Sequence, residues 1–115
     1  MTVTIYHNPR CSKSRQTLAL LREHVKEPEI IQYLENPPTA KQLTKILRLL
    51  NLPPRGLMRQ KEPEYKSLGL DDPNLVDSVL IAAMSANPKI IERPIVVNNN
   101  KAILGRPPEN VLQIL

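Results

Sequence analysis

The chain has 115 residues, a length typical of one domain, with 41% hydrophobic and 23% charged residues. This composition excludes intrinsic disorder, and the three Tyr, which are the only aromatic residues, disfavour a surface that stacks nucleic-acid bases. Cys11 is the one cysteine, which excludes an intramolecular disulfide and a multi-cysteine zinc site. His7 and His24 are the only histidines, so we expect no metal site.

The net charge of +5 is concentrated at the start of the chain. Residues 1–61 carry eleven Lys and Arg against four Asp and Glu, a net charge of +7. A basic half attracts anions, either phosphate-like small molecules or nucleic acid. The start of the chain lacks the apolar region of a signal peptide, and no apolar run approaches the ~20 residues of a membrane span. We therefore expect a cytoplasmic protein that binds no membrane, in a compartment where a lone thiol stays reduced.

The first third of the chain predicts a strand, a helix and a second strand. Residues 2–6 are rich in strand-forming types and are followed by the Asn8-Pro9 break. Apolar residues at near-helical spacing predict a helix from about Ser12 to His24, and residues 29–34 predict the second strand. Within one sheet, this order implies a right-handed parallel crossover.

The middle of the chain predicts helices only. Thr39 and Gln42 form a capping box that opens a helix, and a Pro-Pro pair ends it. Residues 55–70 are charged and predict short helical turns, and a further helix follows that stops before Pro88. We expect these elements to form a helical insertion at about residues 39–87.

The last part of the chain predicts a hairpin and a closing helix. Strands over 94–97 and 101–104 flank Asn98-Asn99-Asn100, which predicts an antiparallel hairpin with a three-residue polar turn. Pro107-Pro108 then begins a helix, because proline is acceptable in a first turn. The order β-α-β … α-β-β-α predicts an α/β protein with a thioredoxin-like fold: a mixed four-stranded sheet with a helical insertion, in a single domain spanning 1–115.

The loop between the first strand and the first helix carries the candidate chemistry. Cys11 lies at the helix start, where free N–H groups and the helix dipole stabilise negative charge. Arg10, Lys13 and Arg15 add positive charge, and the hydroxyl of Ser14, one turn later, can donate to the sulfur. These features predict a lowered thiol pKa, and they also attract an oxyanion.

The alternative interpretation of Cys11 is a small buried hydrophobic residue, but its polar and basic neighbours favour a reactive thiol. We expect His7 to end the strand and orient the loop, and as a cation it could help the thiolate. A tyrosine-phosphatase loop does not fit, since only three residues separate Cys11 from Arg15. A dithiol motif does not fit either, because Ser14 stands where the second cysteine would be. A monothiol site that uses an external thiol remains.

Five segments in order along nearly the whole chain resemble the glutaredoxin-coupled arsenate reductase family. Such an ordered match is more specific than any single motif. The segments are His7-Asn8-Pro9-Arg10-Cys11, Tyr33-Leu34-Glu35-Asn36-Pro37-Pro38, Leu57-Met58-Arg59, Arg93-Pro94-Ile95-Val96-Val97 and Gly105-Arg106-Pro107-Pro108.

The resemblance implies a thioredoxin-like domain that reduces arsenate to arsenite and takes its electrons from glutathione and glutaredoxin. It implies no metal and no bound organic cofactor, with glutathione as co-substrate and no nucleic-acid partner. Pro94 falls where thioredoxin-like folds place a cis-proline. The site residues that it implies are the nucleophile Cys11, the oxyanion-binding Arg59, Arg93 and Arg106, and the thiol-activating His7 and Ser14.

Two other functions are compatible with the same fold. Transcriptional regulators of the Spx type bind RNA polymerase and carry a two-cysteine switch at the positions of Cys11 and Ser14. Ser14 removes that switch, which counts against a binding module. The third hypothesis is a monothiol oxidoreductase that acts on another substrate.

Overall fold

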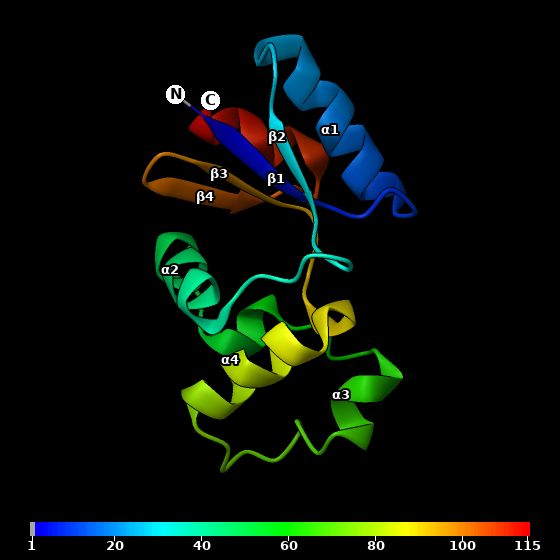
Figure 1. Ribbon diagram of the computed structural model, residues 1–115, viewed down its shortest axis with the longest axis vertical. Coiled ribbons are helices and arrows are strands. Elements are labelled where there is room, and N and C mark those ends of the chain that lie inside the picture. The colour runs from blue at the N-terminus through cyan, green and yellow to red at the C-terminus, as the bar shows by residue number, and fades with distance from the viewer. Residues whose placement is uncertain (1) are drawn as a thin grey trace. The chain divides into compact units, whose positions relative to one another are not determined.

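The computed structural model describes residues 2–115, whose helices and strands follow the predicted order (Figure 1). Contacts divide the chain into two compact units. The first unit combines the chain up to Asn36 with Arg93–Leu115, and the second is Pro37–Glu92. The second unit includes the expected insertion at 39–87, and a single domain spanning both units stays a prediction.

The first unit is built on a four-stranded sheet with the strand order β2-β1-β3-β4. Its strands are β1 (Val3–His7), β2 (Glu29–Gln32), β3 (Ile95–Asn98) and β4 (Lys101–Leu104). β1 pairs with β2 in parallel and with β3 antiparallel, and β3 pairs with β4 antiparallel. The predicted thioredoxin-like mixed sheet is therefore confirmed.

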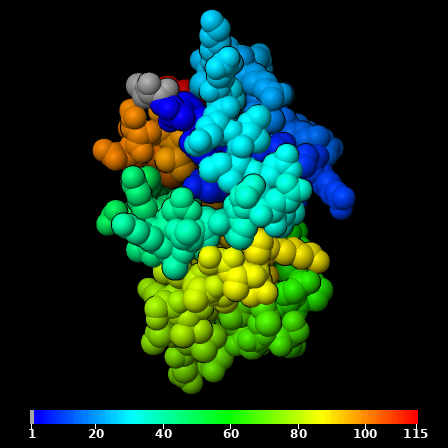
Figure 2. Space-filling view, viewed as in Figure 1, coloured from blue at the N-terminus to red at the C-terminus, as the bar shows by residue number. Residues whose placement is uncertain are grey.

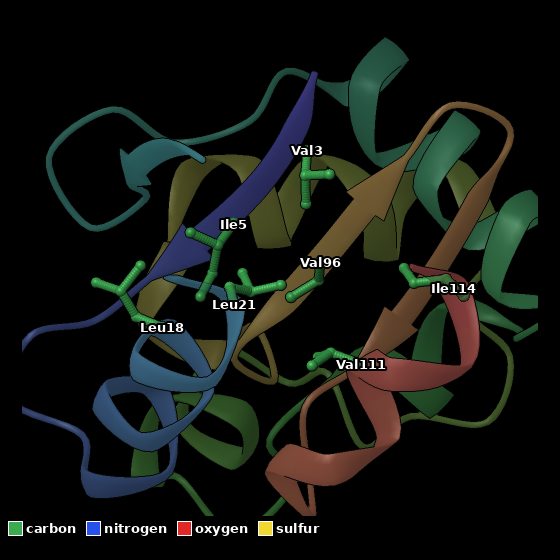
Figure 3. Close-up of a cluster of buried hydrophobic side chains, with 7 residues drawn as sticks. All are labelled: Val3, Ile5, Leu18, Leu21, Val96, Val111 and Ile114. Carbon is green, nitrogen blue, oxygen red and sulfur yellow. The ribbon is translucent and has the colours of Figure 1, made fainter. Parts of the chain in front are cut away.

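Helix α1 (Ser12–His24) and the closing helix η3 (Pro108–Ile114) pack on each other and on the sheet. Their apolar side chains meet those of β1 and β3 in one cluster (Figure 3). The period of two along a strand and of about 3.6 along a helix brings these side chains to shared faces. Burial of each such aliphatic side chain contributes about 1.5–3 kcal/mol. The cluster contains Val3, Ile5, Leu18, Leu21, Val96, Val111 and Ile114.

The second strand is shorter than the predicted range of 29–34. β2 ends at Gln32, because the N–H groups of Glu35 and Asn36 both donate to the Gln32 carbonyl oxygen, at 3.0 and 2.9 Å. The chain turns there at the surface of the first unit (Figure 2), and Leu34 in the turn is 42% exposed.

The hairpin turn contains two residues, where three were predicted. Asn98 belongs to β3 and pairs with Lys101, which leaves Asn99 and Asn100 in the turn. Asn99 has φ of 57°, in the left-handed region that asparagine tolerates better than most residues. The closing helix also differs in type, since η3 is a 3₁₀ helix throughout.

The second unit is helical, as predicted. Thr39 and Gln42 form the predicted capping box: the Thr39 Oγ1 accepts from the Gln42 N–H at 3.1 Å, and the Gln42 Oε1 accepts from the Thr39 N–H at 2.9 Å. Within residues 2–115, no helix has the length and apolar character that crossing a membrane requires. The unit contains α2 (Ala40–Leu50), η1 (Pro54–Leu57), α3 (Pro63–Ser67), α4 (Asp77–Ala86) and η2 (Pro88–Ile90), and α2 packs on α4.

Candidate active site

The loop that follows β1 is held by its own hydrogen bonds. The Asn8 carbonyl oxygen accepts from the Cys11 N–H at 3.0 Å, and the Asn8 Oδ1 accepts from the Arg10 N–H at 3.0 Å. The guanidinium group of Arg15 donates to the Pro9 carbonyl oxygen at 2.9 Å and so fastens the loop to α1. These bonds fix the backbone that carries the half-buried Cys11 thiol.

Cys11 is the residue that precedes the first turn of α1, with extended backbone angles of φ −95° and ψ 123°. An oxygen-bearing side chain usually stands at this position and accepts from the N–H groups of the second and third helical residues. In α1 those residues are Lys13 and Ser14, and the first turn contains no acidic side chain. The helix start is therefore open to an ionised sulfur and to a bound anion.

The pKa of the Cys11 thiol is lowered from its ordinary value by the balance of opposing influences. Burial is the largest of them and raises the pKa, because it disfavours the charged sulfur. The N–H group of Ser14, the charge of Arg93 and the N–H group of Lys13 act in the other direction and together outweigh burial. The thiolate therefore forms more easily than in an exposed cysteine, and the charge that acts on it comes from Arg93, in the last quarter of the sequence.

Arg93 and Arg106 meet beside the sulfur because the hairpin pairs the residues next to them. Arg93 precedes β3 and Arg106 follows β4, and the register places Ile95 opposite Leu104. The Nη1 of Arg106 lies 4.0 Å from the Cys11 Sγ and donates to the Arg93 carbonyl oxygen at 3.4 Å. Both arginines are followed by cis-prolines, and the first of these is at the position that the resemblance implied. Two forked donors and a thiol of lowered pKa thus converge.

Arg59 lies in the second unit, where local contacts hold it. Its Nη2 forms an ion pair with the Glu62 Oε1 at 2.6 Å, and its Nη1 donates to the Lys89 carbonyl oxygen at 3.3 Å. Its backbone N–H donates to the Ile90 carbonyl oxygen at 2.7 Å. The guanidinium group therefore has a fixed place within its own unit, and its role beside Cys11 stays a prediction.

Ser14 is fully buried and its hydroxyl lies between two partners. The Ser14 Oγ is 2.6 Å from the His7 Nδ1 and accepts from the Asn8 N–H at 3.0 Å. If the His7 Nδ1 carries the proton, the serine hydroxyl is free to donate elsewhere; if it does not, the hydroxyl donates to the imidazole. The expected donation from this hydroxyl to the sulfur stays a prediction, whereas the Ser14 backbone N–H does lower the Cys11 pKa.

His7 is buried at the end of β1, and its pKa is lowered from the ordinary value. Burial is the main cause, because the imidazolium ion is poorly solvated there, and the charges of Arg22 and Arg15 add to it. The structure therefore favours a neutral imidazole near neutral pH. A neutral imidazole disfavours the cationic form of the expected help to the thiolate, and the thiol-activating role of His7 stays a prediction, with Ser14 as its hydrogen-bond partner.

Sequence reasoning missed Thr17 and Gly105, which lie just behind the site. Thr17 is fully buried, and its Oγ1 contacts the carbonyl oxygens of Lys13 and Gly105. A signal was present, because Ser14 and Thr17 share a helix face with the core residue Leu21, so a polar side chain there needs a buried partner. Among residues 2–115, no three His, Cys, Asp or Glu side chains are placed to hold a metal ion.

Known proteins are similar to this chain over nearly its whole length. Residues 6–114 match the model of the ArsC family. The chain is 47% identical over 114 residues to the arsenate reductase of Neisseria meningitidis serogroup A, which covers 98% of this chain and 97% of that relative. It is 57% identical over 114 residues to YfgD, an uncharacterized protein of Escherichia coli K12, with coverages of 98% and 96%. The solved structure of an arsenate reductase from Vibrio cholerae matches with a TM-score of 0.96 at 53% identity, covering 100% of this chain and 98% of that one.

Proposed function

The chain belongs to the ArsC family, and from this premise we propose that it reduces arsenate to arsenite with Cys11 as the nucleophile. The observation that carries the proposal is the cluster of the Cys11 sulfur with Arg93 and Arg106, in which the thiol pKa is lowered and a guanidinium nitrogen lies 4.0 Å from the sulfur. Relatives named arsenate reductase match almost the whole chain, which supports the choice of substrate.

Arsenate would bind through its oxygens to the guanidinium groups of Arg93 and Arg106. Forked, permanently charged donors suit a tetrahedral oxyanion, and charge-assisted hydrogen bonds are the stronger kind. The open start of α1 adds N–H groups that favour negative charge at the same place. We propose Arg59 as the third arginine, in agreement with the motif that the family resemblance assigns to it.

In the first step, the Cys11 thiolate attacks arsenic and forms a sulfur–arsenic bond. One arsenic–oxygen bond breaks, and its oxygen leaves as water after protonation, so arsenic remains in the +5 state. The cationic site stabilises the negative charge on the attacked oxyanion. Glutathione then adds its sulfur to arsenic and expels a second water.

Reduction requires two electrons, and two external thiols supply them. The glutaredoxin thiolate attacks the glutathione sulfur, the arsenic–sulfur bond to glutathione breaks, and its electron pair takes arsenic from +5 to +3. Glutaredoxin and glutathione leave as a mixed disulfide, and hydrolysis releases arsenite and the Cys11 thiol. An external donor is needed because Cys11 is the only cysteine of the chain. A cytoplasmic location, where glutathione is kept reduced, belongs to the same proposal.

The test is arsenite production by the purified protein with arsenate, in the presence and absence of glutathione and glutaredoxin. We expect steady turnover only when both thiol components are present. Without them, mass spectrometry should find at most one arsenic adduct per chain, and Cys11→Ser should remove both the adduct and turnover. Sustained arsenite production with thioredoxin alone would contradict the mechanism, and no turnover with any thiol system would contradict the proposed activity.

A further inference from the structure

Thr17 lies on α1, six residues after Cys11, and its side chain is fully buried. Its Oγ1 lies 2.8 Å from the carbonyl oxygen of Lys13 and 3.2 Å from that of Gly105. A threonine hydroxyl carries one proton, so the two carbonyl groups share one donor. The contact with Lys13 is local to the helix, whereas the contact with Gly105 joins residues 88 positions apart.

Gly105 packs against Thr17 with no room for a side chain. A Cβ atom at residue 105 would lie 2.6 Å from the Thr17 Oγ1, 2.8 Å from its Cγ2 and 2.9 Å from the Cγ of Pro94. The Gly105 N–H also donates to the Pro94 carbonyl oxygen at 2.9 Å. Gly105, the residue after β4, therefore lies in close contact both with Thr17 on α1 and with Pro94, the residue before β3.

This contact is one residue from Arg106, one of the two arginines beside the sulfur. Gly105 directly precedes Arg106, and Thr17 stands on the helix that begins after Cys11. The Arg106 Nη1 lies 4.0 Å from the Cys11 Sγ. The backbone position of Arg106 is therefore tied to the spacing between Thr17 and Gly105.

We propose that Thr17 is a positioning residue of the oxyanion site: its hydroxyl holds Gly105 against α1 and thereby places Arg106 beside the Cys11 sulfur. The use of this placement for arsenate rests on the proposed function, but the placement itself does not. The Lys13 carbonyl oxygen can satisfy the hydroxyl within the helix, and the second contact, with the Gly105 carbonyl oxygen, adds a link between α1 and the residue that follows β4. Valine has nearly the same shape as threonine, but it has no hydroxyl group to donate to the Gly105 carbonyl oxygen.

The test compares the alkylation of Cys11 by two reagents, anionic iodoacetate and neutral iodoacetamide. Guanidinium charge at the sulfur favours the anionic reagent, so the ratio of the two rates reports the charge that Arg93 and Arg106 place there, and a Thr17 variant should change only the share that belongs to Arg106. We expect Thr17→Val to lower this ratio roughly threefold and to raise the KM for arsenate by a similar factor with little change in kcat. Thr17→Ser, which keeps the hydroxyl, should retain most of the native ratio.

Two further variants calibrate the measurement. Arg106→Ala sets the ratio expected when the guanidinium group is lost altogether. Thr44→Val is the matched control, because the Thr44 Oγ1 makes the same kind of helix contact, 2.8 Å from the Ala40 carbonyl oxygen, and is exposed. It should leave the ratio and the KM unchanged. If circular dichroism shows that Thr17→Val does not fold, Thr17→Ser and Thr17→Ala supply the comparison, since they differ by the hydroxyl alone.

An equal reagent ratio in Thr17→Val and the native protein would overturn the proposal, as would an equal ratio in the serine and alanine variants. A merely structural role would lower the melting temperature in these variants without changing the ratio. A lowered ratio in a protein that does not reduce arsenate would support the role of Thr17 and contradict the proposed function, so the two failures are distinguishable.

Discussion

The helices α1 and α2 begin in opposite ways. At α2, Thr39 and Gln42 exchange hydrogen bonds and satisfy the N–H groups of the helix start from within. At α1, the corresponding position holds Cys11, whose thiol provides no such oxygen, and the N–H groups of Lys13 and Ser14 instead lower the pKa of the sulfur.

The difference shows how the chain gives up local stability at the site. Replacing a capping residue with one that cannot accept a hydrogen bond costs a helix about 1 kcal/mol. At α1 the missing cap leaves N–H groups at the helix start, which lower the pKa of the Cys11 thiol and can bind an anion. At α2 no reactive group is present, and the cap serves the helix alone. Substitutions at the two helix starts should therefore separate activity from stability.

The largest expected effect comes from the arginines that complete the α1 site. Arg93→Ala and Arg106→Ala should each lower kcat/KM for arsenate about tenfold or more, since a charge-assisted hydrogen bond contributes about 1.5–3 kcal/mol. We expect a similar loss for Arg59→Ala. The measurement is arsenite production with glutathione and glutaredoxin, and unfolding in urea verifies that each variant is folded.

Arg48→Ala is the control for these substitutions, because Arg48 is an exposed cation in the last turn of α2. It should leave kcat/KM unchanged. If Arg48→Ala were as damaging as the other three, the losses would reflect the overall positive charge of the protein, and the assignment of an arginine clamp would be wrong.

The next effect concerns the thiol itself. The rate of Cys11 alkylation by iodoacetamide should rise with pH to a midpoint below the ~8.5 of a free thiol. The lowered pKa is the reason, and it arises from the Ser14 N–H, Arg93 and the Lys13 N–H acting against burial. Ser14→Ala keeps the N–H and removes only the hydroxyl, so a higher midpoint in this variant would reveal a hydroxyl contribution. A native midpoint at or above that of a free thiol would contradict an activated nucleophile.

A smaller effect, on the free energy of unfolding, is expected when the cap of α2 is removed and a capping oxygen is supplied to α1. Thr39→Ala removes the α2 cap and should lower the free energy of unfolding by about 1 kcal/mol while leaving arsenate turnover unchanged. Cys11→Ser supplies α1 with a capping oxygen and should raise the free energy of unfolding by a few tenths of a kcal/mol while abolishing turnover. Urea denaturation of both variants measures the comparison. Destabilisation by Cys11→Ser would show that the sulfur, and not an oxygen, suits the folded helix start.

The same contrast explains which features the sequence could predict. The α2 capping box and the bounds of α1 depend on residues within a few positions of one another, and both predictions are confirmed. The hairpin turn was predicted one residue too long, because the pairing of Asn98 with Lys101 is decided by the sheet register and not by the run of asparagines.

The convergence of Cys11, Arg93 and Arg106 depends on strand pairing between distant segments, so only the family resemblance could predict it. No sequence motif indicates the contact of Thr17 with Gly105, because the two residues are 88 positions apart and meet only in the folded chain. The sequence could not predict the lowered pKa of His7 either, because it depends on burial at the end of β1 and on the cations of α1.

His7 provides the smallest effect, and it concerns pH. Because the pKa of buried His7 is lowered in the folded protein, the imidazole is neutral in both states above the ~6.5 of an exposed histidine. Below that pH the unfolded chain binds the proton first, so the free energy of unfolding falls as the pH drops from ~6.5 towards the lower folded pKa.

His7→Asn removes this titration, and the free energy of unfolding of this variant should decline less between pH 7 and pH 5 in urea denaturation. His24→Asn is the matched histidine substitution at an exposed position, and the pH dependence of His7→Asn is compared with it. Equal slopes for the native protein and His7→Asn would show that His7 takes up its proton without cost, and the cationic role at the thiolate would then be restored.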